Sequence, residues 1–413
     1  MSKKSPQLRF EGFTDDWEER KLSDVANHRG GTAIEKYFDK DGVYKVISIG
    51  SYGLNSQYVD QNIRAISNEI TDGRVVNSGE LTMVLNDKTA NGTIIGRSLL
   101  VEKDNEYVIN QRTEIISPKE NFDSNFAYTI LNGPFREKVK RIVQGGTQIY
   151  VNYPAVSNLN LELPKIEEQK KIGSFFKQLD DTIALHQRKL DLLKEQKKGF
   201  LQKMFPKNGA KVPELRFAGF ADDWEEHKLS SGLREYTDRV TVEDDKEYSQ
   251  ISVRNNFGGI TLRGSKMGNK IGRKRQAKIN LTKYPQTLIF TRQTVEQGGI
   301  GWVDKYCDGA IVTENMPTIS LDTSVFSKYF LTNLFQTRIF YKNAILDNIE
   351  GGSAQIAIHE SKFLSSTLLF PNLDEQEKIG SFFKQLDETI ALHQRKLDLL
   401  KEQKKGFLQK MFV

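Results

Sequence analysis

The chain has 413 residues, which is long enough for two or more domains that each bury a core of their own. Its 60 lysine and arginine residues outnumber 54 aspartate and glutamate residues, and this mild basic excess, with a pI near 9.0, is a weak indication of an anionic partner. The single cysteine, Cys307, excludes an internal disulfide, and because no apolar run resembles a secretory leader or the roughly 18 residues of a membrane span, we expect a cytoplasmic protein.

The first part of the chain has the pattern of a mixed α/β domain. After an opening block, "PQLRFEGFTDDWEERKLS" (Pro6–Ser23), roughly residues 24–160 contain short β-branched or aromatic runs separated by glycine and asparagine turns. Runs such as "VYKVISI" (Val43–Ile49) and "TIIGRSLLVE" (Thr93–Glu102) predict strands. One helical stretch is expected near the end of this region, at Asn125–Val143.

A long amphipathic helix is predicted next, over residues 164–206. Its apolar residues recur at alternating steps of four and three, the heptad spacing of a helix seam, and Pro164 with acidic Glu167 and Glu168 suits its start. At 1.5 Å per residue the helix is roughly 55–60 Å long, and so long a seam needs a partner. The predicted seam residues of this helix and of its second copy are Ile172, Phe176, Leu179, Ile183, Leu190, Leu193, Ile379, Phe383, Leu386, Ile390, Leu397 and Leu400.

The opening block and the long helix both return in the second half of the chain. The opening block comes back at Pro213–Ser230, and Lys171–Phe205 returns at Lys378–Phe412 with one change, each 207 positions on. The chain is therefore one unit written twice, with Trp17 and Trp224 expected in the two cores. Between the matched blocks the sequences have diverged, which argues against a recent duplication and for a shared frame with inserts that must differ.

The second insert, roughly residues 231–368, repeats the element order of the first. "TLIFT" (Thr287–Thr291) and "AIVTENMPTISL" (Ala310–Leu321) predict strands, and Val325–Leu346 predicts one helical stretch. Polar residues interrupt both seams, and we expect them at the seam's edge with their charged or polar ends in water, rather than acting as a pH switch or a register device. They are His186, Lys197, His393 and Lys404.

The clearest electrostatic pattern lies in the second insert. From Tyr248 to Val295 it has ten basic residues and no acidic one, with glycine, asparagine and glutamine between them, as a duplex backbone and base edges require. The first insert offers a weaker counterpart at Leu85–Arg97. The predicted DNA-binding residues are Lys88, Asn91, Arg97, Gln111, Arg112, Thr147 and Gln148 in the first insert, and Arg254, Lys266, Lys270, Arg273, Lys274, Arg275, Arg292, Gln293 and Gln355 in the second.

Motifs for catalysis find little support. "GGITLRGSK" (Gly258–Lys266) approaches a phosphate-binding loop but lacks the order lysine then serine or threonine and the strand-then-helix frame. "NYPAV" (Asn152–Val156) approaches an adenine-methyltransferase signature but lacks the second proline. The five histidines show no metal-ligand spacing. We expect no catalytic residue and no metal site, and a chain that binds without reacting.

The layout resembles the specificity (S) subunit of type I restriction-modification enzymes. "LPKIEEQKKI" (residues 163–172) and "FPNLDEQEKI" (residues 370–379) look like the Pro-x-x-x-Glu-Gln-x-x-Ile start of that family's long helices, and the two "LRFxGFxDDWEExKLS" blocks look like the start of its target-recognition domains. The resemblance covers essentially the whole chain. It implies an α/β (α+β) fold of two mixed target-recognition domains separated by two long helices in an antiparallel coiled coil, with an internal pseudo-two-fold repeat. The expected boundaries are 1–163 and 207–370 for the domains, and 164–206 and 371–413 for the helices.

The resemblance also implies partners. Each domain would read one half of a split double-stranded DNA site, while the helices would fix the unread gap and dock two methyltransferase (M) subunits. This chain would bind no cofactor, because S-adenosylmethionine, ATP and magnesium belong to the M subunits and the motor-nuclease (R) subunits. Two other classes stay open: an enzyme acting alone, which needs a cofactor or metal signature, and a coiled-coil scaffold, which leaves the basic tract unexplained. DNA binding with and without a methyltransferase partner separates the three.

Overall fold

The computed structural model describes residues 5–207, 209–272, 275–349 and 357–412. Its contacts divide the chain into two compact units, residues 1–187 with 395–413 (unit 1) and residues 188–394 (unit 2). Each unit therefore contains one insert together with one half of each long helix. The repeat seen in the sequence is thus a repeat of folded units, although each unit draws on two separate stretches of helix.

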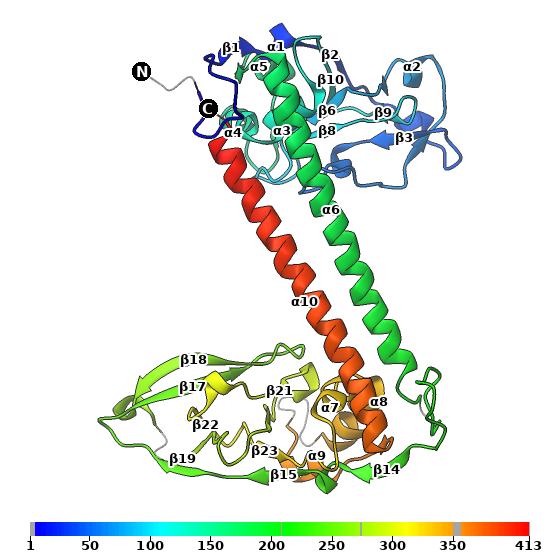
Figure 1. Cartoon of the computed structure of the whole chain (residues 1–413). Helices are drawn as coiled ribbons and strands as arrows, with labels where there is room; N and C mark the ends of the chain where they lie inside the picture. The colour runs from blue at the N-terminus through cyan, green and yellow to red at the C-terminus, as the bar shows by residue number, and fades with distance from the viewer. Residues whose placement is uncertain (1–4, 208, 273–274, 350–356, 413) are drawn as a thin grey trace. The chain divides into compact units, whose positions relative to one another are not determined.

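The described part of unit 1 is a mixed domain of short strands and helices (Figure 1). Its antiparallel sheet has the order β2-β10-β6-β8, and its second sheet, β4-β3-β9-β5, pairs β3 with β9 in parallel. Two smaller sheets, β11-β12-β7 and β1-β13, complete it. The strands are β1 (Glu18–Lys21), β2 (Ala26–Gly30), β3 (Tyr44–Ile47), β4 (Arg64–Ala65), β5 (Val75–Val76), β6 (Leu81–Val84), β7 (Asn86–Asp87), β8 (Ser98–Leu100), β9 (Tyr107–Ile109), β10 (Thr113–Pro118), β11 (Gln144–Gly145), β12 (Ile149–Tyr150) and β13 (Asn160–Leu163). The helices are α1 (Leu22–Val25), α2 (Glu69–Asp72), α3 (Ser124–Asn132), α4 (Pro134–Arg141) and α5 (Tyr153–Ser157), with 3-10 turns at Glu35–Tyr37 and Ile49–Ser51.

Unit 2 repeats the main antiparallel sheet and enlarges the second. The order β15-β23-β20-β21 matches β2-β10-β6-β8, while a five-stranded sheet has the order β16-β19-β22-β17-β18. The strands are β14 (Glu225–Lys228), β15 (Leu233–Tyr236), β16 (Arg239–Thr241), β17 (Glu247–Val253), β18 (Ile260–Met267), β19 (Arg275–Lys278), β20 (Thr287–Phe290), β21 (Ile300–Trp302), β22 (Ile311–Val312), β23 (Thr318–Leu321) and β24 (Thr367–Phe370). The helices are α7 (Lys328–Leu334), α8 (Arg338–Phe340), a π-helical turn (Tyr341–Ile345) and α9 (Glu360–Ser365), with 3-10 turns at Leu229–Ser231, Gly268–Lys270, Val295–Gln297, Lys305–Cys307 and Leu346–Asn348.

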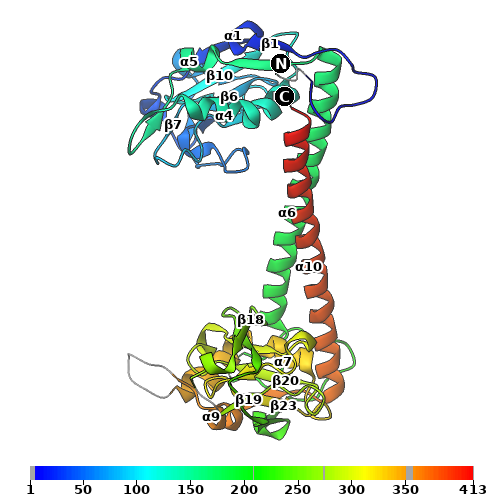
Figure 2. The ribbon, with the colours of Figure 1, turned by 90° about the vertical axis from the view of Figure 1, so that its left-hand side faces the viewer.

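The two long helices, α6 (Ile166–Lys203) and α10 (Leu373–Lys410), have 38 residues each and pack antiparallel within each unit (Figure 2). In unit 1 the ring of Phe175 meets that of Phe407 at 5.0 Å, and Lys404 pairs with Asp180. In unit 2 the ring of Phe200 meets that of Phe382 at 5.0 Å, and Lys197 pairs with Asp387 at 2.7 Å. These contacts repeat with the offset of 207 residues, so the predicted antiparallel helix pairing and the internal repeat are confirmed.

The duplicated motif residues fasten each helix to its domain. Glu168 is buried at 1% exposure and receives two hydrogen bonds from Arg9, at 2.7 and 2.8 Å. The side chain of the next residue, Gln169, donates to the carbonyl of Pro164 and accepts the N–H of Asp123, which caps α3. A side chain at Gly173 would place its Cβ 2.6 Å from the backbone nitrogen of Phe126, so only glycine allows α6 to lie this close to α3.

Unit 2 forms the same fastening with the equivalent residues. Arg216 donates to buried Glu375 at 2.7 Å through two nitrogens, and Gln376 accepts the N–H of Ser327, the cap of α7. The two tryptophans are buried as expected, at 3% for Trp17 and 1% for Trp224. Each packs against the phenylalanine that ends the helix returning from the other half of the chain, Phe412 and Phe205. The ends of both helices therefore belong to the domain cores.

Several predicted elements differ in the structure. The single helical stretch expected at Asn125–Val143 breaks at Gly133 into α3 and α4, and the stretch at Val325–Leu346 breaks into α7, α8 and the π-helical turn. The strand expected at Ala310–Leu321 is two strands in different sheets, and only Ser98–Leu100 of Thr93–Glu102 is a strand. The breaks follow from tertiary packing, which overrides local apolar pattern in short elements.

The polar residues in the seam also differ from expectation. Lys197 and Lys404 do not simply extend into water, because each forms an ion pair across the helix pair with its ammonium partly buried. His186 and His393 are partly buried.

Candidate nucleic-acid interface

Three exposed segments of unit 1 converge on β7. Leu85, just before β7, bonds through its main chain to both neighbouring segments. Its N–H donates to the carbonyl of Arg112 at 3.0 Å, and its carbonyl accepts the N–H of Val151 at 2.9 Å. Asp87 pairs with Ile149 in the antiparallel register of β7 and β12, which places Lys88 beside Gln148. The structure thus brings together five predicted residues from distant parts of the sequence, all of them exposed: Lys88, Asn91, Arg112, Thr147 and Gln148.

A buried carboxylate shapes the loop after β7. Asp87 is 3% exposed and accepts the backbone N–H groups of Thr89 and Ile94, at 2.9 and 2.8 Å, and the Thr89 hydroxyl. Burial alone raises the pKa of Asp87, but these hydrogen bonds outweigh it and leave the pKa below its usual value. The loop that presents Lys88 and Asn91 is therefore held in one shape, a role for Asp87 that the sequence did not indicate.

The other two predicted residues of the first insert also make internal contacts. Arg97 is partly buried, its guanidinium donates to the Ser56 hydroxyl and the Thr93 carbonyl, and burial lowers its pKa. Gln111 is exposed and donates to Glu35 at 2.9 Å. Both lie close to the converging segments, but each already has an internal partner.

In unit 2 the predicted basic residues follow a long hairpin of β17 and β18 (Figure 1). β18 lies at the edge of the five-stranded sheet and its residues from Leu262 onward are exposed, Lys266 among them. Arg254, in the hairpin turn, and Lys270, in the 3-10 turn after β18, are also exposed. Arg275 begins β19, while Arg273, Lys274 and Gln355 lie outside the described residues.

The acid-free tract of the sequence has acidic neighbours in the fold. The N–H of Asn269 donates to the carbonyl of Asp244 at 3.2 Å, so the acidic segment 243–247 runs beside the 3-10 turn that carries Lys270. Lys266 on β18 pairs with Tyr248, next to Glu247, whereas Arg254 lies in the turn at the other end of the hairpin. Of these three residues Arg254 lies farthest along the hairpin from the acidic segment, and phosphate binding stays a prediction for all three.

The two candidates for base reading in unit 2 are in different surroundings. Arg292 donates to Glu360, and both side chains are less than a fifth exposed, at 19% and 18%. Gln293, the next residue, is exposed. Glu360 lies 68 residues away in sequence, so no sequence signal pointed to this ion pair. A hollow of about 410 Å³ opens beside Arg292, lined also by Tyr236, Arg239 and Gln276.

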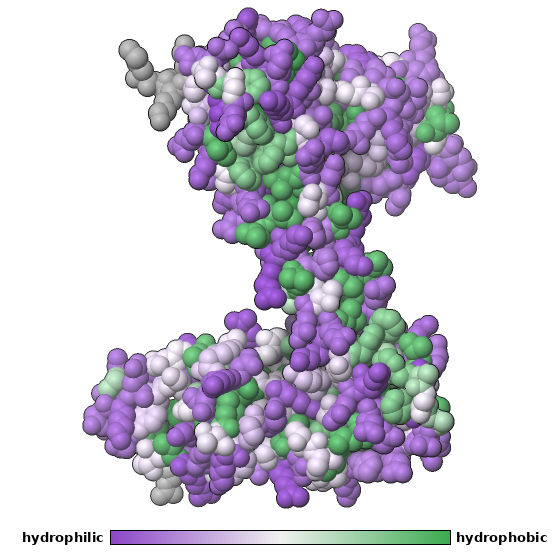
Figure 3. Space-filling model, viewed as in Figure 1, coloured by the Kyte–Doolittle hydropathy of each residue, from purple (hydrophilic) through white to green (hydrophobic). Residues whose placement is uncertain are grey.

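Both long helices also present leucines to the outside. Each unit exposes one from each helix, Leu185 (59%) and Leu399 (54%) in unit 1 and Leu192 (51%) and Leu392 (59%) in unit 2. All twelve predicted seam residues, in contrast, are buried or partly buried. Figure 3 shows apolar side chains gathered over the helices of unit 1 on the face in view. The same two leucine positions are therefore exposed in both copies of the repeat.

Comparison with known proteins identifies the family. The family described as "Type I restriction modification DNA specificity domain" (Methylase_S) matches residues 14–195 and 238–402. The chain belongs to this family. The specificity subunit of the type I restriction enzyme MjaVIII from Methanocaldococcus jannaschii is 21% identical over 95% of this chain and 91% of its own length. That of HindI from Haemophilus influenzae is 27% identical over 41% of this chain and 37% of its own length.

A solved structure shows the same fold. The type I restriction-modification S subunit from M. genitalium matches with a TM-score of 0.65 and 12% identity, over 99% of both chains. The chain is thus a type I specificity subunit in fold and family, with DNA recognition as its function. In the part of the chain that the structure describes, no helix is long and apolar enough to cross a membrane, and no group of three or more histidine, cysteine or acidic side chains is placed to hold a metal ion.

Proposed function

We propose that this specificity subunit reads a bipartite double-stranded DNA site, one half with each unit, and that the paired helices fix the unread gap between the halves. The supporting observation is the contrast between the two copies. Contacts inside the frame repeat with an offset of 207 residues, whereas the exposed loops that carry the candidate reading residues have different sequences and lengths. A frame kept alike around readers that differ suits an asymmetric site with two different halves.

We further propose that two M subunits dock on the helices. The four exposed leucines occur at equivalent positions of the two copies, in nearly identical sequence surroundings, and each is more than half exposed in the described part of the chain. Burying each of them is worth roughly 1.5–3 kcal/mol, and identical surfaces accept identical partners. S-adenosylmethionine would act in the M subunits, which methylate adenine, and ATP and magnesium in the R subunits, which move and cleave DNA. The specificity subunit would contribute binding and orientation alone.

Methylation-sensitive sequencing of DNA from cells that express the chain with its M subunit tests the proposal. We expect one motif with two unlike halves and a fixed gap. Duplicating Lys194–Lys197 and Lys401–Lys404 together lengthens each helix by about 6 Å. The gap should then grow by one or two base pairs at roughly 3.4 Å each, with both halves unchanged. A continuous or symmetric motif in the native protein, or a gap that ignores the insertions, contradicts the proposal.

A further inference from the structure

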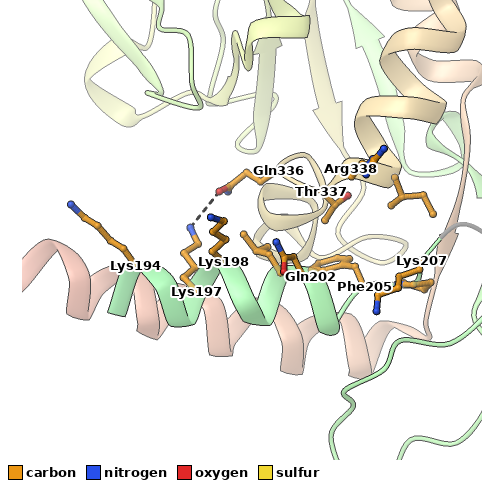
Figure 4. Close-up of a pocket in the computed structure, with 12 residues that line it drawn as sticks. Lys194, Lys197, Lys198, Gln202, Phe205, Lys207, Gln336, Thr337 and Arg338 are labelled. Atoms are coloured by element: carbon orange, nitrogen blue, oxygen red, sulfur yellow. Dashed lines mark hydrogen bonds between the residues drawn. The ribbon is translucent and has the colours of Figure 1, made fainter. Parts of the chain in front are cut away.

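Unit 2 contains a cleft of about 780 Å³ between the last turns of α6 and the segment that joins α7 to α8 (Figure 4). We call it the lysine cleft. On the α6 side it is lined by Lys194, Lys197 and Lys198, and on the other side by Gln336, Thr337 and Arg338, over a floor that includes Leu201 and Phe205. Its lining contains no carboxylate. Such a composition suits a polyanion.

Three of the cleft's cations are not neutralised by the protein. Lys197 is paired with Asp387 and hydrogen-bonded to Gln336, so it belongs to the fold. Lys198 comes no closer than 4.0 Å to Glu195, and both side chains are about 70% exposed, at 67% and 74%. Among the described residues none forms an ion pair with Lys194 or Arg338, which are exposed. Lys194, Lys198 and Arg338 are therefore available to a ligand.

The lysine cleft adjoins the candidate DNA-reading face of unit 2. A second hollow, of about 390 Å³, shares Gln336, Thr337 and Arg338 with the cleft and reaches Asn256 and Phe257 in the β17–β18 turn. That turn is held by backbone hydrogen bonds from Asn256 and Phe257 to Gln297 and Gly298, at 2.7 and 3.0 Å. The second hollow, whose lining also includes Glu296, therefore links the turn that carries exposed Arg254 with Arg338 and the lysines of α6.

Unit 1 has no cation at the position equivalent to Arg338. Asp123 and Ser327 are equivalent. Asp123 caps α3 and donates its N–H to Gln169, and Ser327 caps α7 and donates its N–H to Gln376. Counting from these caps, Arg338 corresponds to Pro134, whereas Lys194 and Lys198 correspond to Lys401 and Lys405. A partner that binds both copies alike does not account for a cleft whose chemistry differs between them. A ligand whose two ends differ, such as an asymmetric DNA site, accounts for that difference between the copies.

We propose that the lysine cleft binds the phosphates of the unread gap next to the half-site that unit 2 reads. This inference rests on the proposed function, because only a bipartite site has such a gap. DNA bound at the β17–β18 turn would have phosphates near the cleft, because the second hollow joins that turn to Gln336, Thr337 and Arg338. Phosphate contacts carry no base information, so the cleft would add affinity and fix the direction of the duplex without adding to the recognised sequence.

The test uses the full chain assembled with its M subunits and a duplex that carries its methylated motif. The triple variant K194Q/K198Q/R338Q should bind roughly 10- to 100-fold more weakly at 0.1 M salt, with the slope of log K against log salt reduced by about 2 to 3, since each phosphate contact contributes about 0.9. The methylated motif should not change. A duplex with uncharged methylphosphonate linkages only in the gap next to that half-site should weaken the native complex similarly, and weaken the triple variant little further.

The chain offers a matched control in K401Q/K405Q, which changes the same sequence context in the copy that has proline in place of Arg338. We expect its affinity to fall less than about twofold. The inference is overturned if the triple variant keeps the native slope, if the control loses as much, or if the methylphosphonate and triple-variant losses simply add. It is also overturned if the triple variant no longer assembles with M subunits, which would identify the cleft as a protein contact. A native complex without a bipartite motif would instead contradict the proposed function.

Discussion

Cutting the chain after Pro206 should give a fragment that forms a symmetric dimer. The fragment keeps the first insert and α6 but loses the last turns of α10, which complete the core of unit 1. Phe412 is 7% exposed there and packs against Trp17, Phe126 and Phe176 at ring distances of 6.0, 5.7 and 5.9 Å. The end of α6 has the same sequence as the end of α10, so Phe205 of a second fragment can take the place of Phe412.

The energy of this exchange can be worked from the structure. The last turns of α10 contribute four apolar side chains to unit 1, those of Phe407, Leu408, Met411 and Phe412. At roughly 1.5–3 kcal/mol each, one such contact is worth about 6–12 kcal/mol and the two contacts of a dimer about 12–24 kcal/mol. Association costs roughly 4–15 kcal/mol, and about 8 kcal/mol of surplus gives a micromolar dissociation constant. We therefore expect dimers at micromolar concentration.

Sedimentation or light scattering of the fragment at about 10 μM checks this expectation. The Phe205→Ala fragment is the control, because Phe205 packs in unit 2 of the intact chain and has no place in the fold of a single fragment. It removes two buried rings per dimer, at about 3–5 kcal/mol each, and should be monomeric. With M subunits, the native dimer should direct methylation of a palindromic motif that repeats the first half-site. A monomeric native fragment, or an asymmetric motif, would refute the reasoning.

Two further predictions concern reading and stability. Lys266→Ala should weaken binding to all duplexes alike and lower the slope of log K against log salt by about 0.9. Gln293→Ala should relax the sequence preference of one half-site in methylation sequencing and leave that slope unchanged. A changed motif for Lys266→Ala, or an unchanged motif for Gln293→Ala, contradicts the assignments. Arg9→Ala leaves Glu168 buried without its partner and should lower the free energy of unfolding, measured in urea, by about 3–5 kcal/mol. The control Arg20→Ala, whose partner Glu18 is 70% exposed, should lower it by less than about 1 kcal/mol. Equal losses would show that burial of the pair is unimportant.

The repeat made much of this fold predictable from the sequence. Two helices near the predicted positions and the two buried tryptophans follow from periodic apolar residues and a constant offset, whereas the antiparallel pairing was predicted from the resemblance to the family. The contacts that shape the candidate interface were not predictable in this way, because Asp87 is held by the loop that follows it and Glu360 lies 68 residues from Arg292. No sequence pattern marked Asp87 or Glu360 as a partner in these contacts. The position of the acidic segment beside Lys270 was not predicted either, since the order of charges along a chain does not specify which charges are neighbours in the fold.

The near identity of the two helices has two separate physical origins. At one set of positions the identity is required inside the chain: Glu168, Gln169 and Gly173, with their equivalents, fasten each helix to its domain, and Phe205 and Phe412 fill the two cores. These residues would stay alike even in a protein without partners.

At the exposed positions no such requirement applies. Leu185 and Leu392 are both 59% exposed, and burial inside the described fold does not explain a leucine at either. If M subunits dock there, a single polar substitution at one copy should leave folding intact and remove one M subunit, whereas the same substitution at a fastening residue should unfold one unit. The identical sequence therefore has to be separated position by position into an inner and an outer set, and burial in the structure is what separates them.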